Sequence, residues 1–154
     1  MADTSELAKL QAERDALLDR VARTQAEFDN YRKRSAREQA DFRDYAAADA
    51  VKSLLPVIDS FDLALKAPSS GEDSELRKGV ELIRKQLDEV LARMGVKPVP
   101  AVGEVFDPRF HEAIEMVETD DAEDNHVITE LTRGYKIKDR LLRPAMVRVA
   151  RNHK

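Results

Sequence analysis

Residues 7–45 read LAKLQAERDALLDRVARTQAEFDNYRKRSAREQADFRDY, and this stretch decides the fold. It contains no Gly or Pro, and a seven-residue register runs through it without a break. Eight of the twelve inner positions are apolar or aromatic, and the twelve are Leu7, Leu10, Arg14, Leu17, Val21, Thr24, Phe28, Tyr31, Ser35, Glu38, Phe42 and Tyr45. A helix of this length spans roughly 55–60 Å, beyond what a small domain covers. The narrow apolar stripe therefore predicts pairing with a partner helix.

The stripe is interrupted by polar side chains at Arg14, Thr24, Ser35 and Glu38. Each would place a polar group between the paired helices, so we expect weak pairing. One interpretation is a marginal coiled coil that serves as a spacer. The other is a helix pair that melts on heating, which would suit a stress-response protein.

A broader apolar face follows the stripe between residues 46 and 65 and predicts a helix that packs against a core. Pro56 lies inside this run and is expected to kink the helix or to start a new one. Residues 67–73 are rich in turn formers and predict a loop. A second helix should then carry an apolar face and end at Gly95, and its apolar residues are Leu76, Val80, Ile83, Leu87, Val90, Leu91 and Met94. Two such hairpins would form a four-helix bundle.

The helical period ends at Gly95, and Pro98, Pro100 and Gly103 indicate a linker. Asp107 followed by Pro108 is typical of a helix start, so we expect a short helix carrying His111 and Ala113. The predicted strands are 114–118, 127–132, 135–138 and 142–150. The fold class is therefore α+β. Its predicted domains are a long paired helix (1–48), a helical hairpin forming a dimeric four-helix bundle (49–97) and a β-domain (98–154).

Charge is segregated within this β-domain. Residues 104–124 hold nine acidic residues and one basic residue, a net charge of −8. Residues 133–154 hold eight basic residues and one acidic residue, a net charge of +7. Paired strands that neutralise each other would explain part of this pattern. The alternative is a basic face on the last hairpin that docks an acidic partner surface.

The composition narrows the functional classes. Charged residues make up 36% and aromatic residues 5% of the chain, as expected for long exposed helices. The net charge of −4 gives no general attraction to nucleic acid or to an anionic membrane. Without cysteine there is no disulfide or thiolate chemistry. No apolar run approaches the roughly 20 residues of a membrane span, and the N-terminus lacks the pattern of a signal peptide. We therefore expect a cytoplasmic protein.

A search for reactive constellations finds no enzyme motif. His111-Glu112-Ala113-Ile114-Glu115 resembles the start of a zinc-protease helix but has Glu where the second His ligand belongs. There is no P-loop and no nucleophile elbow, so no metal or other cofactor is predicted. The basic cluster Arg32-Lys33-Arg34 with Arg37 supports a nucleic-acid hypothesis. Acidic residues interleave with this cluster, however, and a solvated helix face is the simpler interpretation.

The C-terminal half resembles the GrpE family closely. The matching residues are Phe106-Asp107-Pro108, His111, Ala113, Ile114, Gly134-Tyr135, Asp139, Leu142-Arg143, Ala145, Val147 and Val149. The helical part is also similar, in residues 27–34, 54–60 and 79–83. The resemblance implies a parallel homodimer with paired helices, a four-helix bundle and two β-wings. It also implies a nucleotide exchange factor that binds the nucleotide-binding domain of DnaK, an Hsp70-class chaperone, and accelerates ADP release without binding nucleotide itself.

The resemblance further implies that the partner contact lies in the basic part of the β-domain. Arg140 and Arg143, beside Gly134 and Tyr135, are expected at or near the chaperone. Leu131 and Met146 are candidate apolar contacts, with burial in the core as the alternative, and a turn with positive φ is the alternative for Gly134. Dimerisation is assigned to Leu7, Leu10, Leu17, Val21, Phe28, Tyr31, Phe42, Tyr45, Leu76, Val80, Ile83 and Leu87.

Two other functions remain open from the residues. A coiled-coil scaffold without exchange activity would explain the helices equally well. A nucleic-acid-binding dimer would use the cluster between Arg32 and Arg37. A mere spacer does not need the GrpE-like signature of the β-domain, so this resemblance favours the exchange factor.

Overall fold

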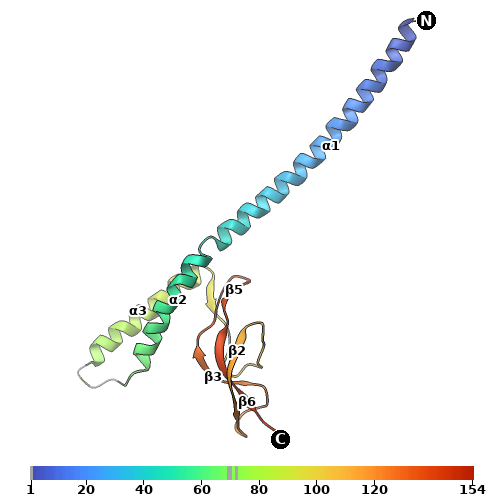
Figure 1. The fold of residues 1–154 in the computed structure, drawn as a ribbon. Coiled ribbons are helices and arrows are strands. Elements are labelled where there is room, and N and C mark those ends of the chain that lie inside the picture. Colours follow the sequence, from blue (N-terminus) through green and yellow to red (C-terminus); the bar gives the residue numbers. More distant parts are fainter. Residues whose placement is uncertain (1, 69–70, 72) are drawn as a thin grey trace. The chain divides into compact units, whose positions relative to one another are not determined.

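The computed structural model describes residues 2–68, 71 and 73–154, and the α+β fold class is confirmed (Figure 1). The chain divides into two compact units, Met1–Asp44 and Tyr45–Lys154. The first unit is helical, and the second combines two helices with β-strands.

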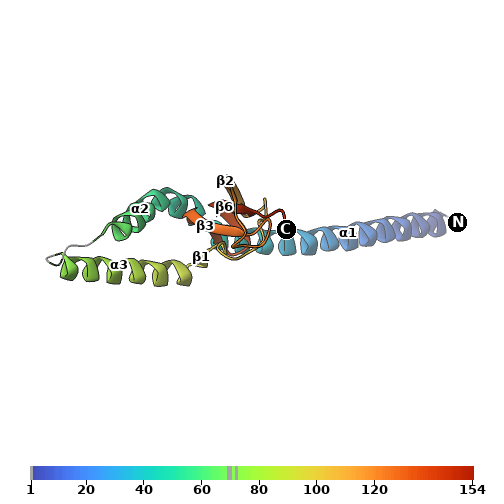
Figure 2. The same cartoon turned by 90° about the horizontal axis from the view of Figure 1, so that it is seen from below.

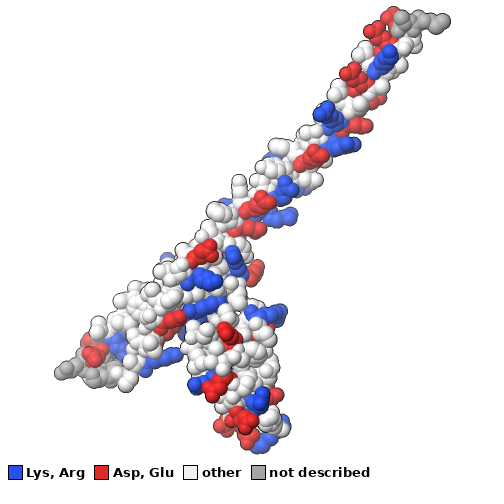
Figure 3. All heavy atoms as spheres, in the orientation of Figure 1, with Lys and Arg blue, Asp and Glu red and all other residues white. Residues whose placement is uncertain are grey.

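The first unit consists of helix α1, Ala2–Tyr45. Its 44 residues include neither Gly nor Pro, and ion pairs such as Arg34 to Glu38 (3.9 Å) lie one turn apart on its surface. Lysine and arginine alternate with acidic side chains along its visible length (Figure 3). The large apolar side chains of the predicted stripe before Tyr45 are all more than half exposed, so nothing within this unit covers them.

Helix α2, Ala48–Lys66, begins after a turn at residues 46–47. The prediction that Pro56 starts a new helix is wrong, because α2 continues through Pro56. Proline has no backbone N–H to donate to the preceding turn. Ser60 Oγ donates to the Pro56 carbonyl (3.0 Å), and α2 is curved along its length (Figure 2). Val51, Leu55 and Ile58 form the buried face.

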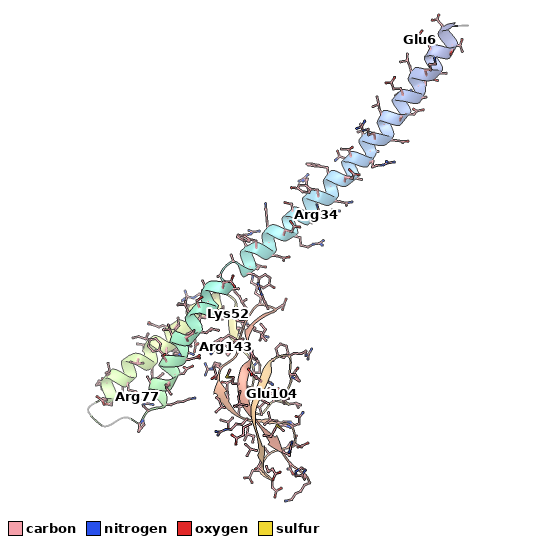
Figure 4. All side chains as sticks on the ribbon, viewed as in Figure 1. Glu6, Arg34, Lys52, Arg77, Glu104 and Arg143 are labelled. Carbon is pink, nitrogen blue, oxygen red and sulfur yellow. The ribbon has the colours of Figure 1, made fainter. Side chains whose placement is uncertain are left out.

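Helix α3, Ser74–Arg93, lies beside α2 and completes a helical hairpin (Figure 2). The predicted loop at 67–73 separates them, although residues 69–70 and 72 lie outside the described part of the chain. Arg77, labelled in Figure 4, donates to the carbonyl of Ala67 (2.6 Å) and so satisfies the end of α2. The predicted cap glycine is confirmed, because Gly95 follows the end of α3 with φ of 83°.

Two three-stranded sheets follow the hairpin. The first sheet is antiparallel, in the order β1 (Val96–Pro98), β4 (Tyr135–Ile137) and β5 (Arg140–Arg143). In the second sheet β6 (Ala145–Arg151) is central, parallel to β2 (His111–Glu118) and antiparallel to β3 (Val127–Thr132). We call residues 96–154 the β-domain.

Three local predictions in the β-domain are wrong. The predicted linker after Gly95 contains β1. The expected short helix is a single turn, in which the Asp107 carbonyl accepts from the N–H of His111 (2.8 Å), because His111 then pairs with Ala145 and enters β2. The expected last strand is divided into β5 and β6 at Pro144, whose missing N–H cannot join a strand ladder.

Two apolar clusters hold the second unit together. The first joins the hairpin to the first sheet and contains Ala48, Val51, Leu55, Ile58, Leu91, Val96, Tyr135, Ile137 and Leu142. The second lies under the second sheet and contains Ala101, Val127, Ala145, Val147 and Val149, with Phe106 packed against it. The hairpin and the first sheet therefore share one core.

Candidate partner-binding surface

Arg143, at the end of β5, is bound within the molecule. Its guanidinium donates to both carboxylate oxygens of Asp59 on α2, through Nη1 at 2.6 Å and through Nη2. Its Nε donates to the carbonyl of Arg133 (2.9 Å), and the guanidinium carbon lies 5.8 Å from the centre of the Tyr135 ring. Figure 4 shows Arg143 where the strands meet α2. The bidentate pair ties β5 to the hairpin.

Tyr135, the first residue of β4, is 1% exposed and meets a second arginine. Arg84 on α3 donates through Nη2 to the Tyr135 hydroxyl (3.0 Å), through Nε to Asp62 (2.8 Å) and through Nη1 to Asp88 (2.5 Å). Burial opposes the charge of Arg84, but the hydrogen bonds to Asp62 and Asp88 outweigh burial and raise its pKa above the ordinary value. Arg84 therefore stays charged inside the joint between hairpin and sheet.

Gly134 precedes β4 and is required by close packing. A Cβ at this position would lie 2.4 Å from the backbone nitrogen of Ala145 and 2.8 Å from the carbonyl carbon of Pro144. The alternative that Gly134 supplies a positive φ is wrong, because the glycines with positive φ among the described residues are Gly95 and Gly103. Gly134 instead lets the backbone before β4 pack directly against the backbone between β5 and β6.

Three predicted contact residues present exposed side chains. Arg140 begins β5 and is exposed to solvent. Leu131 on β3 and Met146 on β6 are each 38% exposed. The pairing of β3 with β6 places Thr132 opposite Met146, so Leu131 and Met146 lie at neighbouring register positions.

A groove of about 400 Å³ runs between α2 and the β3–β4 segment. Leu63 and Leu131 supply its apolar surface, and Asp59, Asp62 and Arg133 supply charge. Burial opposes the charge of Arg133, while Tyr135 and Asp62 favour it, and the net effect raises the pKa of Arg133. The groove thus combines apolar surface with carboxylates that are already paired, Asp59 with Arg143 and Asp62 with Arg84.

The acidic and basic segments of the β-domain lie side by side. Acidic β2 pairs with basic β6, and Arg148 Nε lies 2.9 Å from Glu115. Lys154 and Asp120 form a similar pair at 3.1 Å. Neutralisation between paired strands therefore accounts for part of the charge pattern, whereas Arg140 on β5 remains outside that pairing.

The predicted dimerisation residues differ in how far they are exposed. Most of them are exposed apolar side chains, and these are Leu7, Leu10, Leu17, Val21, Phe28, Tyr31 and Phe42 on α1 and Leu76 and Ile83 on α3. Val80 is half-buried. Tyr45 and Leu87 instead pack against the first apolar cluster of their own chain.

The described residues contain neither a membrane span nor a metal-binding cluster. Between residues 2 and 154, leaving aside 69–70 and 72, no helix is both long and apolar enough to cross a membrane. The same residues contain no group of three or more His, Asp or Glu side chains arranged to hold a metal ion.

Comparison with known proteins decides the family. A family model described as GrpE matches residues 1–151. The chain belongs to the GrpE family. Protein GrpE of Acidobacterium capsulatum is 53% identical over 156 residues, covering 97% of this chain and 75% of that protein. Protein GrpE of Oceanobacillus iheyensis is 42% identical over 147 residues, covering 96% and 77%. The resemblance drawn from the sequence is confirmed.

The motifs that carry the GrpE resemblance include structural positions. His111 is 5% exposed, and its ring accepts from the N–H of Asp107 (3.1 Å) and meets the Pro100 carbonyl (2.7 Å). Val147 and Val149 are fully buried. These GrpE-like residues hold the second sheet in place and leave Arg140 as an exposed member of the basic hairpin.

Sequence reasoning did not single out Asp59, Asp62 or Arg84. One signal was present, because Val80, Arg84, Leu87 and Leu91 are spaced as one face of a helix, and a charged residue within an apolar face needs a partner. Which carboxylate would supply that partner depends on the approach of α2, which the spacing within α3 does not reveal.

Proposed function

We propose that this GrpE-family protein is a nucleotide exchange factor, a co-chaperone that binds the nucleotide-binding domain of DnaK and accelerates ADP release. The observation that carries the proposal is the family match across residues 1–151, which includes both the helices and the β-domain. A spacer would need only the helices. The proposal therefore assigns the partner contact to the β-domain and assembly to the helices.

Assembly as a parallel homodimer is supported by the uncovered apolar side chains of α1 and of the hairpin. The α1 stripe leaves 53–75% of each large apolar side chain before Tyr45 exposed. The outer face of the hairpin exposes Leu54, Val57, Leu76, Leu82 and Ile83, each at least half accessible. A second copy would cover both surfaces, pairing α1 with α1 and joining two hairpins into a four-helix bundle.

The proposed chaperone contact centres on Arg140. Its guanidinium offers a planar pair of donors to a carboxylate on the partner, and Leu131 and Met146 add apolar contact. Gly134, Tyr135 and Arg143 lie beside this region but are engaged inside the molecule. We propose that they support the contact by holding β4 and β5.

The proposed mechanism is linkage between two ligands of the chaperone. A protein that binds the open, nucleotide-free state more tightly than the ADP-bound state shifts the population toward the open state. It must then weaken ADP by the same factor by which ADP weakens it. No bond is made or broken, so the proposal requires neither a catalytic residue nor a cofactor, and no nucleotide site on this chain.

Stopped-flow release of a fluorescent ADP analogue from DnaK tests the proposal. The expected result is faster release with rising concentration of this protein. Arg140→Ala should weaken the effect, whereas Arg151→Ala, an exposed arginine on β6, serves as the matched control. A release rate unchanged by saturating wild-type protein contradicts the proposed function, and equal rates for both variants remove Arg140 from the contact.

A further inference from the structure

Two arginines cross the joint between hairpin and β-domain in opposite directions. Arg143 reaches from β5 to Asp59 on α2, and Arg84 reaches from α3 to Tyr135 on β4 while it also binds Asp62 on α2. Both meet the same tyrosine, one at the hydroxyl and the other at the ring. We call these five residues the arginine latch.

We propose that Arg143 is a positioning residue: bound to Asp59, it fixes the orientation of the β-domain on the hairpin and so determines how Arg140 faces a partner. The effect on partner binding rests on the proposed function. The orientation of the β-domain on the hairpin is a property of the chain and can be measured without a partner. Arg143 is thereby assigned to an internal contact rather than to direct contact with the chaperone.

The geometry favours the internal role for Arg143. Its side chain is 20% exposed, and its Nε, Nη1 and Nη2 all donate inside the molecule, to Arg133 and Asp59. A carboxylate from a partner would have to compete with a bidentate carboxylate already in place. The planar fork also restricts rotation more than a lysine would, because both of its outer nitrogens must face the same carboxylate.

The apolar packing between the hairpin and the first sheet does not by itself fix their relative orientation, which is why a directional contact such as Arg143 to Asp59 is needed. The apolar cluster shared by α2 and the first sheet stabilises their packing, but burial of apolar surface does not depend on direction and allows small rotations. Strand β6 of the second sheet follows β5 directly after Pro144, and Gly134 packs against the Pro144–Ala145 backbone, so a small rotation at β5 is carried into β6. The two arginines supply directional contacts at this point.

Distance measurements between spin labels test the orientation directly. The chain contains no cysteine, so the substitutions Lys85→Cys on α3 and Glu118→Cys at the end of β2 give specific labelling of two exposed positions. Labelled chains are mixed with an excess of unlabelled wild type, so that distances within one chain dominate. The wild-type latch should give a single narrow distance distribution.

Charge reversal separates the latch from ordinary surface pairing. Arg143→Asp and Asp59→Arg should each broaden the distribution, and the double variant D59R/R143D should narrow it again. Arg148→Asp is the matched control, because its pair with Glu115 lies within the second sheet. Should Arg143→Asp fail to fold by circular dichroism, Arg143→Lys replaces it and should broaden the distribution less, since lysine keeps the charge and loses the fork.

The spin-label distances test the orientation, and the rate of ADP release tests the proposed function, so the two can fail separately. A broadened Arg143→Asp chain should need about tenfold more protein to half-saturate ADP release, equal to about 1.4 kcal/mol, with a normal rate at saturation. A distribution that stays narrow in Arg143→Asp overturns the inference, and if stimulation is lost at the same time Arg143 contacts the chaperone directly. If wild-type protein does not stimulate release yet Arg143→Asp broadens the distances, the proposed function fails and the latch is supported.

Discussion

Helix α1 and the second unit solve the problem of apolar burial in different ways. The large apolar side chains of α1 before Tyr45 remain more than half exposed, whereas the second unit encloses two apolar clusters of its own. Both regions are regular and contain good secondary-structure formers. The difference shows that helix-forming sequence settles local structure, while the width of the apolar face settles whether a segment folds by itself or waits for a partner.

The largest expected effect separates these two kinds of apolar residue. Leu55→Ala removes a side chain that is 1% exposed, and we expect a loss of about 4 kcal/mol in the unfolding free energy of the second unit. Leu17→Ala, at 53% exposure, should instead lower a melting transition of α1 that depends on concentration. Thermal melts by circular dichroism over a hundredfold concentration range check both, and an α1 transition in Leu17→Ala that does not depend on concentration would contradict the contrast.

Close backbone packing in the second unit should give the next largest effect. Gly134→Ala places a methyl group 2.4 Å from the nitrogen of Ala145, and we expect a loss of about 3 kcal/mol because backbone cannot move aside as a flexible side chain can. Gly71→Ala is the control, since a Cβ there meets nothing within 4 Å. Urea denaturation measures the stability of both variants, and equal midpoints would show that the backbone at Gly134 is less closely packed against Ala145 than in the structure.

Filling the stripe of α1 should act in the opposite direction. Thr24 occupies an inner position between Val21 and Phe28, and Thr24→Leu should stabilise the paired helices by about 1.5 kcal/mol through added apolar burial. The same substitution at Thr129, an exposed residue of β3, should leave stability nearly unchanged. A rise in the melting temperature of α1 that does not depend on concentration would mean that the stripe is covered by its own chain.

The smallest effect concerns a surface ion pair of the β-domain. Side-chain and backbone hydrogen bonds from Arg109 lower the pKa of Asp107 below its usual value. Because the pKa is lower in the folded state, this contribution is present above the unfolded pKa of about 4 and is lost as pH falls through the folded value. NMR titration of the Asp107 carboxyl should give a midpoint below that of Arg109→Ala, and identical midpoints would exclude the pair.

Much of the fold follows from the residues in sequence. The unbroken register predicts α1, Gly95 predicts the end of the hairpin, and the strand predicted at 127–132 is β3, all as the structure has them. The errors have physical causes. Asp107-Pro108 is an equally good start for a single turn, and the competing pairing of His111 with β6 is a long-range contact that no local pattern reveals.

The candidate contact site also contains one residue whose role is visible in the sequence and one whose role depends on a long-range contact. Exposure of Arg140 agrees with a residue type suited to binding carboxylates, and that much is visible in sequence. The internal engagement of Arg143 depends on Asp59, which lies 84 residues earlier in the chain. Two arginines of one short strand thus have different surroundings, which only the packing of α2 against β5 distinguishes.

The apolar stripe of α1 is covered by a second copy of the chain in the proposed dimer, whereas the second unit encloses apolar clusters of its own. Sedimentation equilibrium of the full chain at micromolar concentration tests it most directly. The expected mass is that of two chains of 17.4 kDa each, and a variant with Leu17→Glu and Val21→Glu should shift the equilibrium toward one chain while the β-domain keeps its dispersed NMR spectrum. A wild-type mass of 17.4 kDa at that concentration would contradict the account.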